Sequence, residues 1–557
     1  MSTNDGRPVA AREGMFPTLT AAQIARVRPY GHERTLADGE ALFMNGTDSY
    51  RFSVVLEGAV RIVTPNDGSE IVVHSAGQFV GDVDVLAGRG GIVSGFAVGA
   101  TRVLEVERAR LQTLVQNDTE LSDLLLRAFV MRRLELISRG VSDLILIGSR
   151  HSAQTLRLQE FLSRNGRPYQ YMDVERDPTV QELFDRLHVS ADDVPIVVHA
   201  GKDVLKKPSV EEVADCCGLN RLDESQVRDV IVVGAGPAGL AAAVYAASEG
   251  LDALVLEANS PGGQAGTSSK IENYLGFPTG ISGQNLASRA FLQAEKFGAQ
   301  VSVARSAAKL GCETRPFKIG LASGGQVMAR AIVIASGVQY RKPDVPDLER
   351  FAGNGVYFAA TPIEATVCKA EDVIIVGGAN SAGQAAVFLS GIARRVYMLV
   401  RGKGLSETMS KYLIRRIEET PNIDLRPRTK IVHIEGQEQI ENIVIETGGE
   451  RRSSLDARHV FMMTGADPNT DWLASCVVLD EKGFVKTGAD ITPEELARAR
   501  WPLARPPHRL ETSIPRVFAV GDVRAGSLKR VSAAVGEGAA CVSLVHQVLA
   551  ESLAGAQ

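Results

Sequence analysis

The chain contains the stretch Val230-Ile-Val-Val-Gly234-Ala-Gly236-Pro-Ala-Gly239, which leads into the alanine-rich run 240–247. The apolar residues predict a buried strand, the glycines a tight turn and the alanines a helix. Glycines at this spacing let a pyrophosphate approach the backbone and lie on the helix N-terminus. Leu254-Val-Leu-Glu257 then ends a second strand on an acid suited to a ribose diol. We therefore predict that a dinucleotide binds here.

A second strand–turn–helix pattern follows at Val373-Ile-Ile-Val-Gly377-Gly-Ala379-Asn-Ser-Ala382, with alanine at the second and third glycine positions. Alanine is tolerated at the third position and is a mild departure at the second. The next strand runs into Arg401 and Lys403 where an acid would favour NAD. Cations there suit a 2′-phosphate, so we predict NADPH. Solvated surface charge is the alternative interpretation of this pair.

Further motifs over residues 228–545 resemble those of low-molecular-weight thioredoxin reductases, and they occur in that family's order. They read Pro261-Gly-Gly-Gln264 with Ile271-Glu-Asn273-Tyr-Leu-Gly-Phe-Pro278, then Ile332-Val-Ile-Ala-Ser-Gly337, then Val517-Phe-Ala-Val-Gly521-Asp522. By this resemblance Gln264 and Asn273 contact FAD, and Asp522 binds its ribityl chain. Lys529-Arg530-Val531 would open a helix whose N-terminus faces the flavin and stabilises negative charge on the reduced ring. The resemblance implies FAD and NADPH as cofactors and favours a homodimer.

The predicted cofactor-binding residues fall into two groups. The FAD group is Gly234, Gly236, Pro237, Ala238, Gly239, Glu257, Gly263, Gln264, Asn273, Gly337, Gly521, Asp522, Lys529, Arg530 and Val531. The NADPH group is Gly377, Ala379, Asn380, Ser381, Ala382, Arg401 and Lys403, with Arg415 and Arg416 as further contributors from the next helix. No metal site is predicted.

The redox-active Cys-x-x-Cys of that family is missing from this chain. A gap-free count back from Gly377 places it at Ala360-Thr361-Pro362-Ile363, so both cysteines are lost. Neither Ala360 nor Ile363 can form a disulfide, and the catalytic residues therefore stay unassigned. Glu364 stands where the family has an acid, and we interpret it as a carboxylate at a helix N-terminus. The six cysteines present elsewhere are interpreted as small buried hydrophobic residues.

Residues 143–220 resemble a thioredoxin or glutaredoxin module. The expected order is β-α-β-α-β-β-α, with Ser152-Ala-Gln-Thr155 where a Cys-x-x-Cys would begin the first helix. Val194-Pro195 matches the segment that usually carries a cis-proline in that fold. Hydroxyls cannot cycle as disulfides, so the module is predicted to be redox-inactive and to serve docking or as a lid.

Residues 14–140 resemble a cyclic-nucleotide-binding β-roll. The likeness rests on short β runs with glycine turns and on Gly77-x-Phe79-Val-Gly81-Asp82. In that family a Glu binds the ribose and an Arg nine residues later pairs with the cyclic phosphate. Here Asp82 replaces the Glu, the Arg position falls on Gly91, and Arg89 is two residues out of register. Without the guanidinium, a cyclic nucleotide is expected to be a weak effector at most.

Composition limits the remaining classes. The 557 residues carry a net charge of −5, which gives no reason to expect a nucleic-acid partner. Six cysteines form no disulfide framework, and a reduced cytoplasmic location fits best. We predict no signal peptide, because the first residues contain no apolar stretch. We predict no membrane span, because glycines and a proline break the uncharged run from Val230 to Ser248.

The expected fold is multidomain: an N-terminal β-roll with helices, a thioredoxin-fold-like α/β module, and two Rossmann-like α/β domains. The expected boundaries are 14–140, 143–220, 228–340 with 470–552 for FAD, and 341–469 for NADPH. The predicted activity is NADPH oxidation through FAD, with electrons passing to a small-molecule or protein acceptor rather than an internal dithiol. Two alternatives stay open, namely a thioredoxin-disulfide reductase using other cysteines and a cyclic-nucleotide-regulated redox sensor.

Overall fold

A computed structural model describes the protein at residues 13–47, 50–65, 67–201, 203–437, 439–473 and 476–554. The chain forms two compact units, each discontinuous in sequence. The first contains residues up to Ser149, then 165–222 and 292–304. The second contains 150–164, 223–291 and everything from 305 onward.

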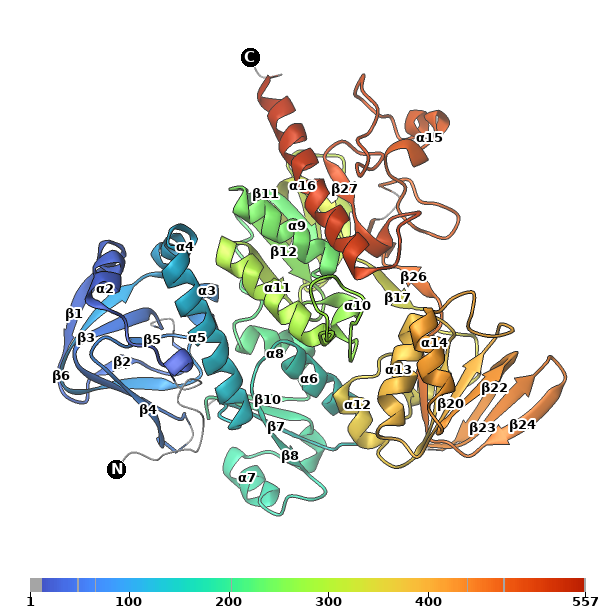
Figure 1. The fold of residues 1–557 in the computed structure, drawn as a ribbon, viewed down its shortest axis with the longest axis horizontal. Coiled ribbons are helices and arrows are strands. Elements are labelled where there is room, and N and C mark those ends of the chain that lie inside the picture. Colours follow the sequence, from blue (N-terminus) through green and yellow to red (C-terminus); the bar gives the residue numbers. More distant parts are fainter. Residues whose placement is uncertain are drawn as a thin grey trace. The chain divides into compact units, whose positions relative to one another are not determined.

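The first unit begins with an antiparallel β-roll (Figure 1). Its sheet has the order β1-β6-β3-β4, with β2 paired to β6 and β5 paired to β3. The rings of Phe52, Phe79 and Phe129 lie 5.5–6.1 Å apart in its core. The strands are β1 (Gly31–Leu36), β2 (Ala41–Phe43), β3 (Phe52–Val63), β4 (Glu70–Ser75), β5 (Phe79–Val80) and β6 (Ser94–Val106). The helices are α2 (Ala21–Val27), α3 (Val83–Ala87), α4 (Arg108–Asn117) and α5 (Thr119–Ser138).

A four-stranded mixed sheet follows in the same unit, in the order β10-β9-β7-β8. Its strands are β7 (Leu144–Gly148), β8 (Gln170–Asp173), β9 (Ile196–His199) and β10 (Asp203–Lys206), and its helices are α7 (Val180–Leu187) and α8 (Val210–Cys216). The Val194–Pro195 peptide bond is cis, as the thioredoxin-like pattern predicted. Helix α6 (Ala153–Arg164) groups with the second unit.

The second unit contains two strand–glycine–helix domains. In the first, β12-β11-β16-β15-β14 form one sheet, with β27 paired to β16, and β11, β12, β16 and β27 run parallel. Helices α9 and α16 pack against each other beside it (Figure 1). The strands are β11 (Val227–Val233), β12 (Ala253–Glu257), β14 (Ala307–Gly311), β15 (Phe317–Leu321), β16 (Gln326–Ile334) and β27 (Val517–Ala519); the helices are α9 (Pro237–Ser248) and α16 (Val531–Ala554).

The second domain of this unit is a parallel sheet in the order β18-β25-β19-β20-β21, with a three-stranded antiparallel sheet, β22-β23-β24. Its elements are β18 (Val356–Tyr357), α12 (Pro362–Val367), β19 (Asp372–Val376), α13 (Asn380–Ser390), β20 (Arg395–Val400), α14 (Lys411–Glu418), β21 (Ile423–Pro427), β22 (Thr429–Gly436), β23 (Ile440–Thr447), β24 (Arg451–Leu455) and β25 (His459–Met462). Two chain crossings join it to the first domain, and they pair as β17 (Val338–Tyr340) and β26 (Ala466–Pro468).

Helix α16 is long and apolar enough to cross a membrane over Val531–Glu551, by length and composition alone. It was not the stretch considered in the sequence. A core helix passes the same test, and α16 packs on α9 so closely that a Cβ on Gly538 would lie 2.1 Å from the Ala238 carbonyl oxygen. The helix therefore packs into the core of the first strand–glycine–helix domain.

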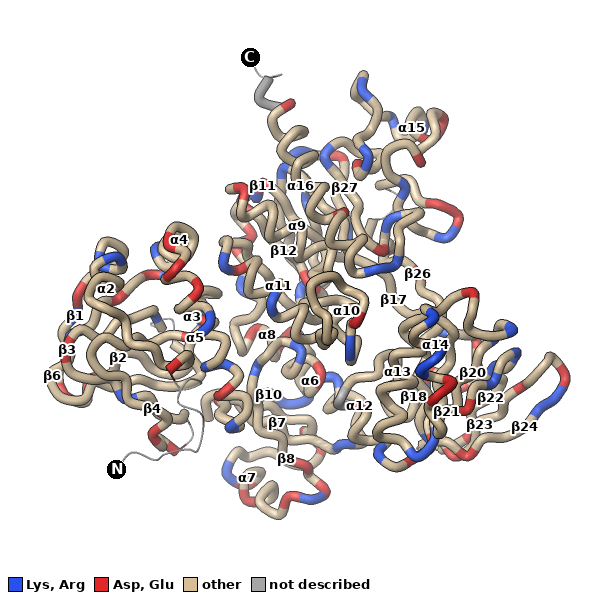
Figure 2. Tube along the Cα trace, in the orientation of Figure 1, with Lys and Arg blue, Asp and Glu red and all other residues tan. Residues whose placement is uncertain are grey.

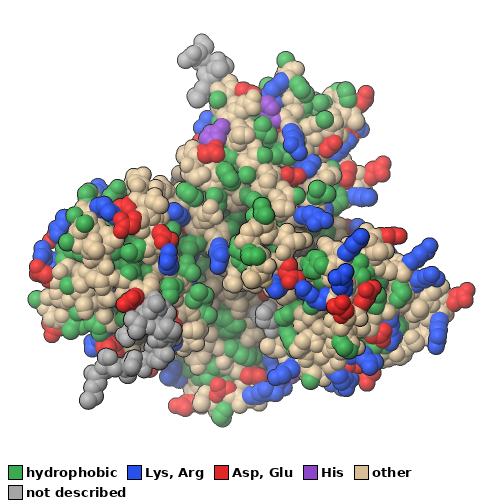
Figure 3. Space-filling model, viewed as in Figure 1, with side chains coloured by type: hydrophobic (Ala, Val, Ile, Leu, Met, Phe, Trp, Pro, Cys, Tyr) green, Lys and Arg blue, Asp and Glu red, His purple; other side chains and the backbone are tan. Residues whose placement is uncertain are grey.

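Charges of both signs are distributed along the chain trace, with cations along α14 (Figure 2). The face drawn in Figure 3 likewise mixes basic and acidic side chains.

Candidate functional site

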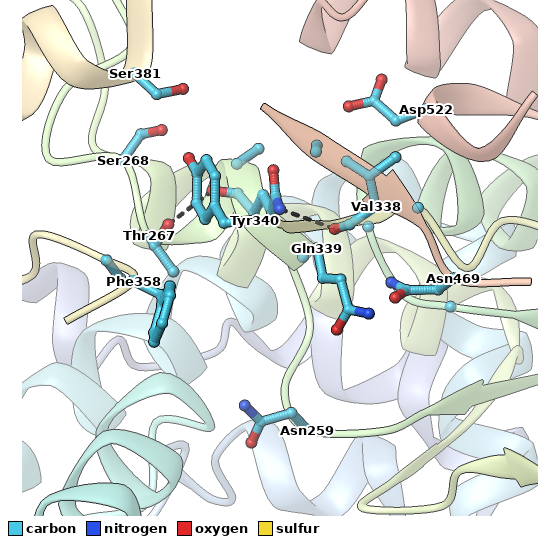
Figure 4. A pocket seen from close by; sticks show the side chains of 18 of the residues that line it. Asn259, Thr267, Ser268, Val338, Gln339, Tyr340, Phe358, Ser381, Asn469 and Asp522 are labelled. Carbon is cyan, nitrogen blue, oxygen red and sulfur yellow. Dashed lines mark hydrogen bonds between the residues drawn. The ribbon is translucent and has the colours of Figure 1, made fainter. Parts of the chain in front are cut away.

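A cavity of about 1210 Å³ lies between the two strand–glycine–helix domains of the second unit. In the view of Figure 4, Ser381, Ser268, Thr267 and Phe358 lie on one side of it and Asn469 and Asp522 on the other. It collects most of the predicted residues: Gly234, Gly236, Pro237, Ala238, Glu257, Gly263, Gln264, Asn273, Gly337, Ala379, Asn380, Ser381, Asp522, Lys529, Arg530 and Val531. Gly239, Gly377, Ala382, Arg401, Lys403 and Gly521 are not among its described lining residues.

The three glycines of the first loop have different surroundings. A Cβ on Gly234 would lie 2.3 Å from the Ala335 carbonyl oxygen, and one on Gly239 would lie 1.8 Å from the Gly234 carbonyl oxygen. A Cβ on Gly236 would meet nothing closer than Gly263 Cα at 4.0 Å. Gly234 and Gly239 therefore permit close packing of strand, turn and helix, whereas Gly236 leaves open space at the N-terminus of α9.

Glu257 holds the turn in place. Its Oε2 accepts a hydrogen bond from the Ala235 amide at 2.7 Å, and its Oε1 accepts one from the Asn259 amide at 2.9 Å. Burial raises the pKa of this carboxyl, while these amides oppose the rise. Oε1 also accepts from the Ser260 amide at 3.2 Å, so Oε2 is the oxygen that keeps a second lone pair for a hydroxyl in the cavity.

The loop at 261–273 connects the cavity wall to β17, one of the two strands that cross between the domains. Gln264 donates from Nε2 to the Val338 carbonyl of β17 at 2.8 Å, and the Thr267 hydroxyl donates to the Gln264 carbonyl at 2.9 Å (Figure 4). A Cβ on Gly263 would lie 3.1 Å from Gly236 Cα. These two glycines thus pack backbone against backbone, and neither places a side chain over the N-terminus of α9.

The carboxyl-terminal motif contributes an acid and a helix end. Burial raises the pKa of Asp522, and Lys529 opposes that rise. The Gly521 amide donates to Glu537 Oε2 at 2.7 Å, and a Cβ on Gly521 would lie 2.8 Å from Ala238 Cβ. Gly521 therefore packs against α9, and Asp522 and the start of α16 face the cavity.

The second glycine loop is built like the first. A Cβ on Gly377 would lie 2.3 Å from the Met463 carbonyl oxygen, at a φ of +150°. Asn380 Oδ1 accepts a hydrogen bond from the Ser410 amide at 2.8 Å, which fixes the start of α13. Arg401 and Lys403 are exposed on the loop after β20, outside the described cavity lining. Arg416 pairs with Glu272 at 2.9 Å, so it is engaged with the first domain.

Glu364 lies at the first turn of α12 and also lines the cavity. Its Oε2 accepts a hydrogen bond from the Thr361 amide at 2.9 Å, the arrangement expected of a helix N-terminal carboxylate. Burial raises the pKa of Glu364, the Thr361 hydroxyl opposes the rise, and the nearby Glu160 carboxylate adds to it.

Sequence reasoning missed helix α6 as part of this site. Ala153, Leu156, Arg157 and Glu160 all line the cavity. Arg164 donates from Nη2 to the Gly263 carbonyl at 3.0 Å, in the loop that faces Gly236. No motif marks these residues, because their position depends on a tertiary contact. The apolar periodicity of α6 was visible in the sequence, but its neighbour was not.

Comparison with known proteins agrees with this geometry. Residues 228–538 match the family described as pyridine nucleotide-disulphide oxidoreductase, and residues 33–118 match the cyclic nucleotide-binding domain. The chain belongs to the pyridine nucleotide-disulphide oxidoreductase family. This confirms the predicted family and, with the β-roll, the predicted multidomain fold class.

Individual members of the family are similar over the same region. The thioredoxin reductase of Mycolicibacterium smegmatis is 32% identical over 327 residues, 58% of this chain and 97% of that protein. NADPH-dependent thioredoxin reductase 3 of Arabidopsis thaliana is 30% identical over 361 residues, 61% of this chain and 64% of that protein. The crystal structure of T. acidophilum thioredoxin reductase has a TM-score of 0.51 at 25% identity, covering 58% of this chain and 99% of that one.

Within this pyridine nucleotide-disulphide oxidoreductase, the predicted dithiol positions lie at the start of α12. Ala360 is 7% exposed, and the side chain of Ile363 lies outside the described part of the structure. Cys368, the cysteine nearest in sequence, is buried, and burial raises the pKa of its thiol to about 12. Cys541 is likewise buried.

One pair of cysteines differs from the sequence interpretation. Cys312, after β14, forms a disulfide with Cys476, 164 residues later. The expectation that all six cysteines are free hydrophobic residues is wrong for this pair. The two are brought together when the 3₁₀ turn Asp471–Leu473 packs on β14, a contact that residue spacing cannot reveal.

In the β-roll segment predicted to resemble a nucleotide cassette, the charged side chains pair with other residues of the protein. Arg89 pairs with Asp84 and with Glu295, each at 2.8 Å, and its side chain is 12% exposed. Asp82 caps α3 by accepting from the Asp84 amide at 3.0 Å. A Cβ on Gly91 would lie 3.1 Å from the Tyr50 ring. The position of the missing arginine is thus packed against an aromatic side chain.

Proposed function

We propose that this chain is an NADPH-dependent FAD oxidoreductase whose electrons pass to a small molecule rather than to an internal dithiol. The observation that supports this most directly is the cavity, which adjoins both glycine loops and includes Glu364 but no cysteine among its described lining residues. A disulfide relay needs two thiols within bonding reach of each other and access to the flavin.

FAD is proposed for the first loop. Gly236 and Gly263 place no side chain over the N-terminus of α9, so a pyrophosphate in the cavity could approach the amides that begin this helix. Glu257 would receive the ribose, Asp522 the ribityl chain, and the N-terminus of α16 the ring. FAD bound there supplies two-electron transfer between a nicotinamide and an acceptor.

NADPH is proposed for the second loop, with Ala379, Asn380 and Ser381 at the start of α13 receiving its pyrophosphate. Arg401 and Lys403 would bind the 2′-phosphate, because a guanidinium can make two parallel hydrogen bonds to a phosphate. The name of the Arabidopsis thaliana relative, which states NADPH dependence, supports this choice of nucleotide.

The acceptor is proposed to be small because α6 forms part of the cavity wall. Leu156 and Glu160 lie on it, and Arg164 ties α6 to the Gly263 loop. A protein acceptor would need this helix to leave before it reached the residues around Glu364. Glu364 would hold a proton on its carboxyl group beside the acceptor, since burial favours its neutral form.

The two alternative functions have less support. A thioredoxin-disulfide reductase using other cysteines would need a reactive thiol at the site, yet Cys368 and Cys541 are buried with pKa values raised by burial. A cyclic-nucleotide-regulated sensor would need a free cationic anchor, yet Arg89 is paired with two carboxylates.

The test is NADPH oxidation by the FAD-loaded protein with a small quinone, oxygen or thioredoxin as acceptor, each with and without cAMP. We expect turnover with the quinone, none with thioredoxin and no response to cAMP. Thioredoxin-dependent turnover would contradict the proposed acceptor, and NADPH failing to reduce the flavin would contradict the activity itself.

A further inference from the structure

A group of metal-ligating side chains lies in the first unit, in the four-stranded mixed sheet. His199 ends β9 and Asp203 begins β10, and the two residues pair directly across the hairpin. Cys216 is the last residue of α8. One ligand atom from each lies within 4.8 Å of the other two, which brings an imidazole, a carboxylate and a thiol together.

The imidazole of His199 is oriented by a buried carboxylate. Its Nε2 lies 3.2 Å from Asp143 Oδ2, and the Asp143 side chain is fully buried. Asp143 also accepts from Arg167 Nη2 at 2.8 Å, which balances its charge. When Nε2 carries its proton toward this carboxylate, the other ring nitrogen, Nδ1, points away from Asp143 and keeps a lone pair for a ligand. A carboxylate behind a histidine is the usual support for a metal-ligating imidazole.

The Nδ1 atom is the second, independent observation. His199 is 8% exposed, and its Nδ1 is buried with no hydrogen bond of ordinary geometry. A buried nitrogen without a partner normally costs free energy, so its orientation calls for a ligand. It faces Asp203 Oδ2 at 3.7 Å.

We propose that His199, Asp203 and Cys216 bind a divalent cation of zinc-like chemistry, with water as the fourth ligand. Nitrogen and oxygen ligands about 2.0–2.2 Å from a tetrahedral ion lie about 3.3–3.6 Å from each other. Nδ1 and Oδ2 are 3.7 Å apart, slightly more than this, and the exposed Asp203 side chain can turn to close the difference. Thiolate and carboxylate together balance the two positive charges. A thiolate selects a borderline or soft ion over Mg²⁺ or Ca²⁺.

Protons compete with the metal at this site. Burial lowers the pKa of His199, but the Asp143 carboxylate and the Cys216 thiol outweigh burial and raise this pKa to about 9. The charged groups facing the ring are Asp143, Arg167 behind it, and Asp203. A metal at this site needs a free Nδ1 lone pair and a thiolate, so its apparent affinity should fall as the pH is lowered.

The test uses the full-length, FAD-loaded chain stripped of metal with a chelator. Zn²⁺ binding is measured by equilibrium dialysis, and alkylation of Cys216 by iodoacetamide is followed by mass spectrometry with Zn²⁺ or Mg²⁺. We expect one Zn²⁺ per chain, and slower alkylation of Cys216 with Zn²⁺ only. Asp203→Asn and Cys216→Ser should each weaken binding at least about tenfold.

Asp192→Asn is the matched control, because Asp192 is an exposed carboxylate outside the cluster, and it should bind Zn²⁺ like the parent chain. Asp203 is 68% exposed at its side chain, so its replacement should not disturb folding. The proposal would be overturned if Asp203→Asn and Cys216→Ser bound Zn²⁺ as tightly as the parent chain does. An alkylation rate at Cys216 that Zn²⁺ leaves unchanged would overturn it too.

Discussion

At the residue scale, Gly236 separates cofactor binding from folding. Its φ of −71° and ψ of −177° suit any residue, and a Cβ there meets no atom closer than 4.0 Å. We expect Gly236→Val to fold but to lose FAD, because the branched side chain fills the space proposed for the pyrophosphate. FAD per chain, measured from absorbance after gel filtration, should drop to near zero.

Gly239→Ala is the comparison that shows the difference. Its Cβ would lie 1.8 Å from the Gly234 carbonyl oxygen, so the turn must move. Overpacking of this kind costs about 1–3 kcal/mol of unfolding free energy, sometimes more. The melting temperature of the FAD-free protein should therefore be lower for Gly239→Ala than for Gly236→Val. FAD bound normally by Gly236→Val would contradict the proposed site.

Arg401 tests the nucleotide preference. It is exposed, so its loss should not destabilise the fold. A charge-assisted hydrogen bond contributes about 1.5–3 kcal/mol, which corresponds to about a 10- to 150-fold change in affinity. We expect Arg401→Ala to weaken NADPH binding by up to that factor and to leave NADH binding unchanged. Both are measured from the concentration dependence of flavin reduction in stopped flow. Arg451→Ala, an exposed cation of β24, is the control. Equal effects on both nucleotides would show that Arg401 is surface charge.

Glu364 should make stability depend on pH. Its pKa is raised in the folded state, mainly by burial, so the folded protein binds the proton more tightly than the unfolded chain. Stability is then lost as the pH rises from the ordinary glutamic-acid value through the raised one. We expect Glu364→Gln to increase the melting temperature at pH 8 and to have little effect near pH 4. A gain that does not vary with pH would mean that the pKa of Glu364 is not raised in the folded protein.

At the element scale, the sequence predicted what local periodicity and glycine spacing determine. The strands and helices around Gly234 and Gly377 follow from apolar runs that end at glycines, and α16 begins at Val531 as predicted. The α6 wall and the Cys312–Cys476 bond were missed, because each depends on two segments far apart in the chain. Surface loops such as the one holding Arg401 give no packing signal either.

The Cys312–Cys476 disulfide should stabilise the second unit. It closes a loop of 164 residues, and such bonds typically contribute about 2–4 kcal/mol by restricting the unfolded chain. One kcal/mol shifts the melting temperature by about 2–4 °C in domains of this size. A reductant should therefore lower the melting temperature by several degrees. The melting temperature of Cys312→Ser should already be lower without reductant, and adding reductant should not change it. The melting temperature of Cys368→Ser should fall with reductant as that of the parent chain does.

At the scale of the whole molecule, two segments resemble known modules in sequence but lack the residues that those resemblances would make functional. The segment predicted to resemble a thioredoxin module has Ser152 and Thr155 where that resemblance places a dithiol, and the β-roll has Gly91 where it places an arginine. Within the second unit, α6 closes one wall of the cavity. The helix that would carry a dithiol thus lines the site instead.

Electron transfer in this protein should therefore not need any cysteine. We expect a chain with all six cysteines changed to serine or alanine to oxidise NADPH with a small quinone at a rate close to that of Cys312→Ser/Cys476→Ser. That double variant is the reference because both chains lack the disulfide, so the loss of stability that comes from this bond is shared. Both should be assayed well below their melting temperatures and at equal FAD content. The physical reason is that Cys368 and Cys541 are buried thiols with raised pKa values, which makes them poor nucleophiles. Loss of quinone turnover in the cysteine-free chain alone would mean that a thiol carries the electrons after all.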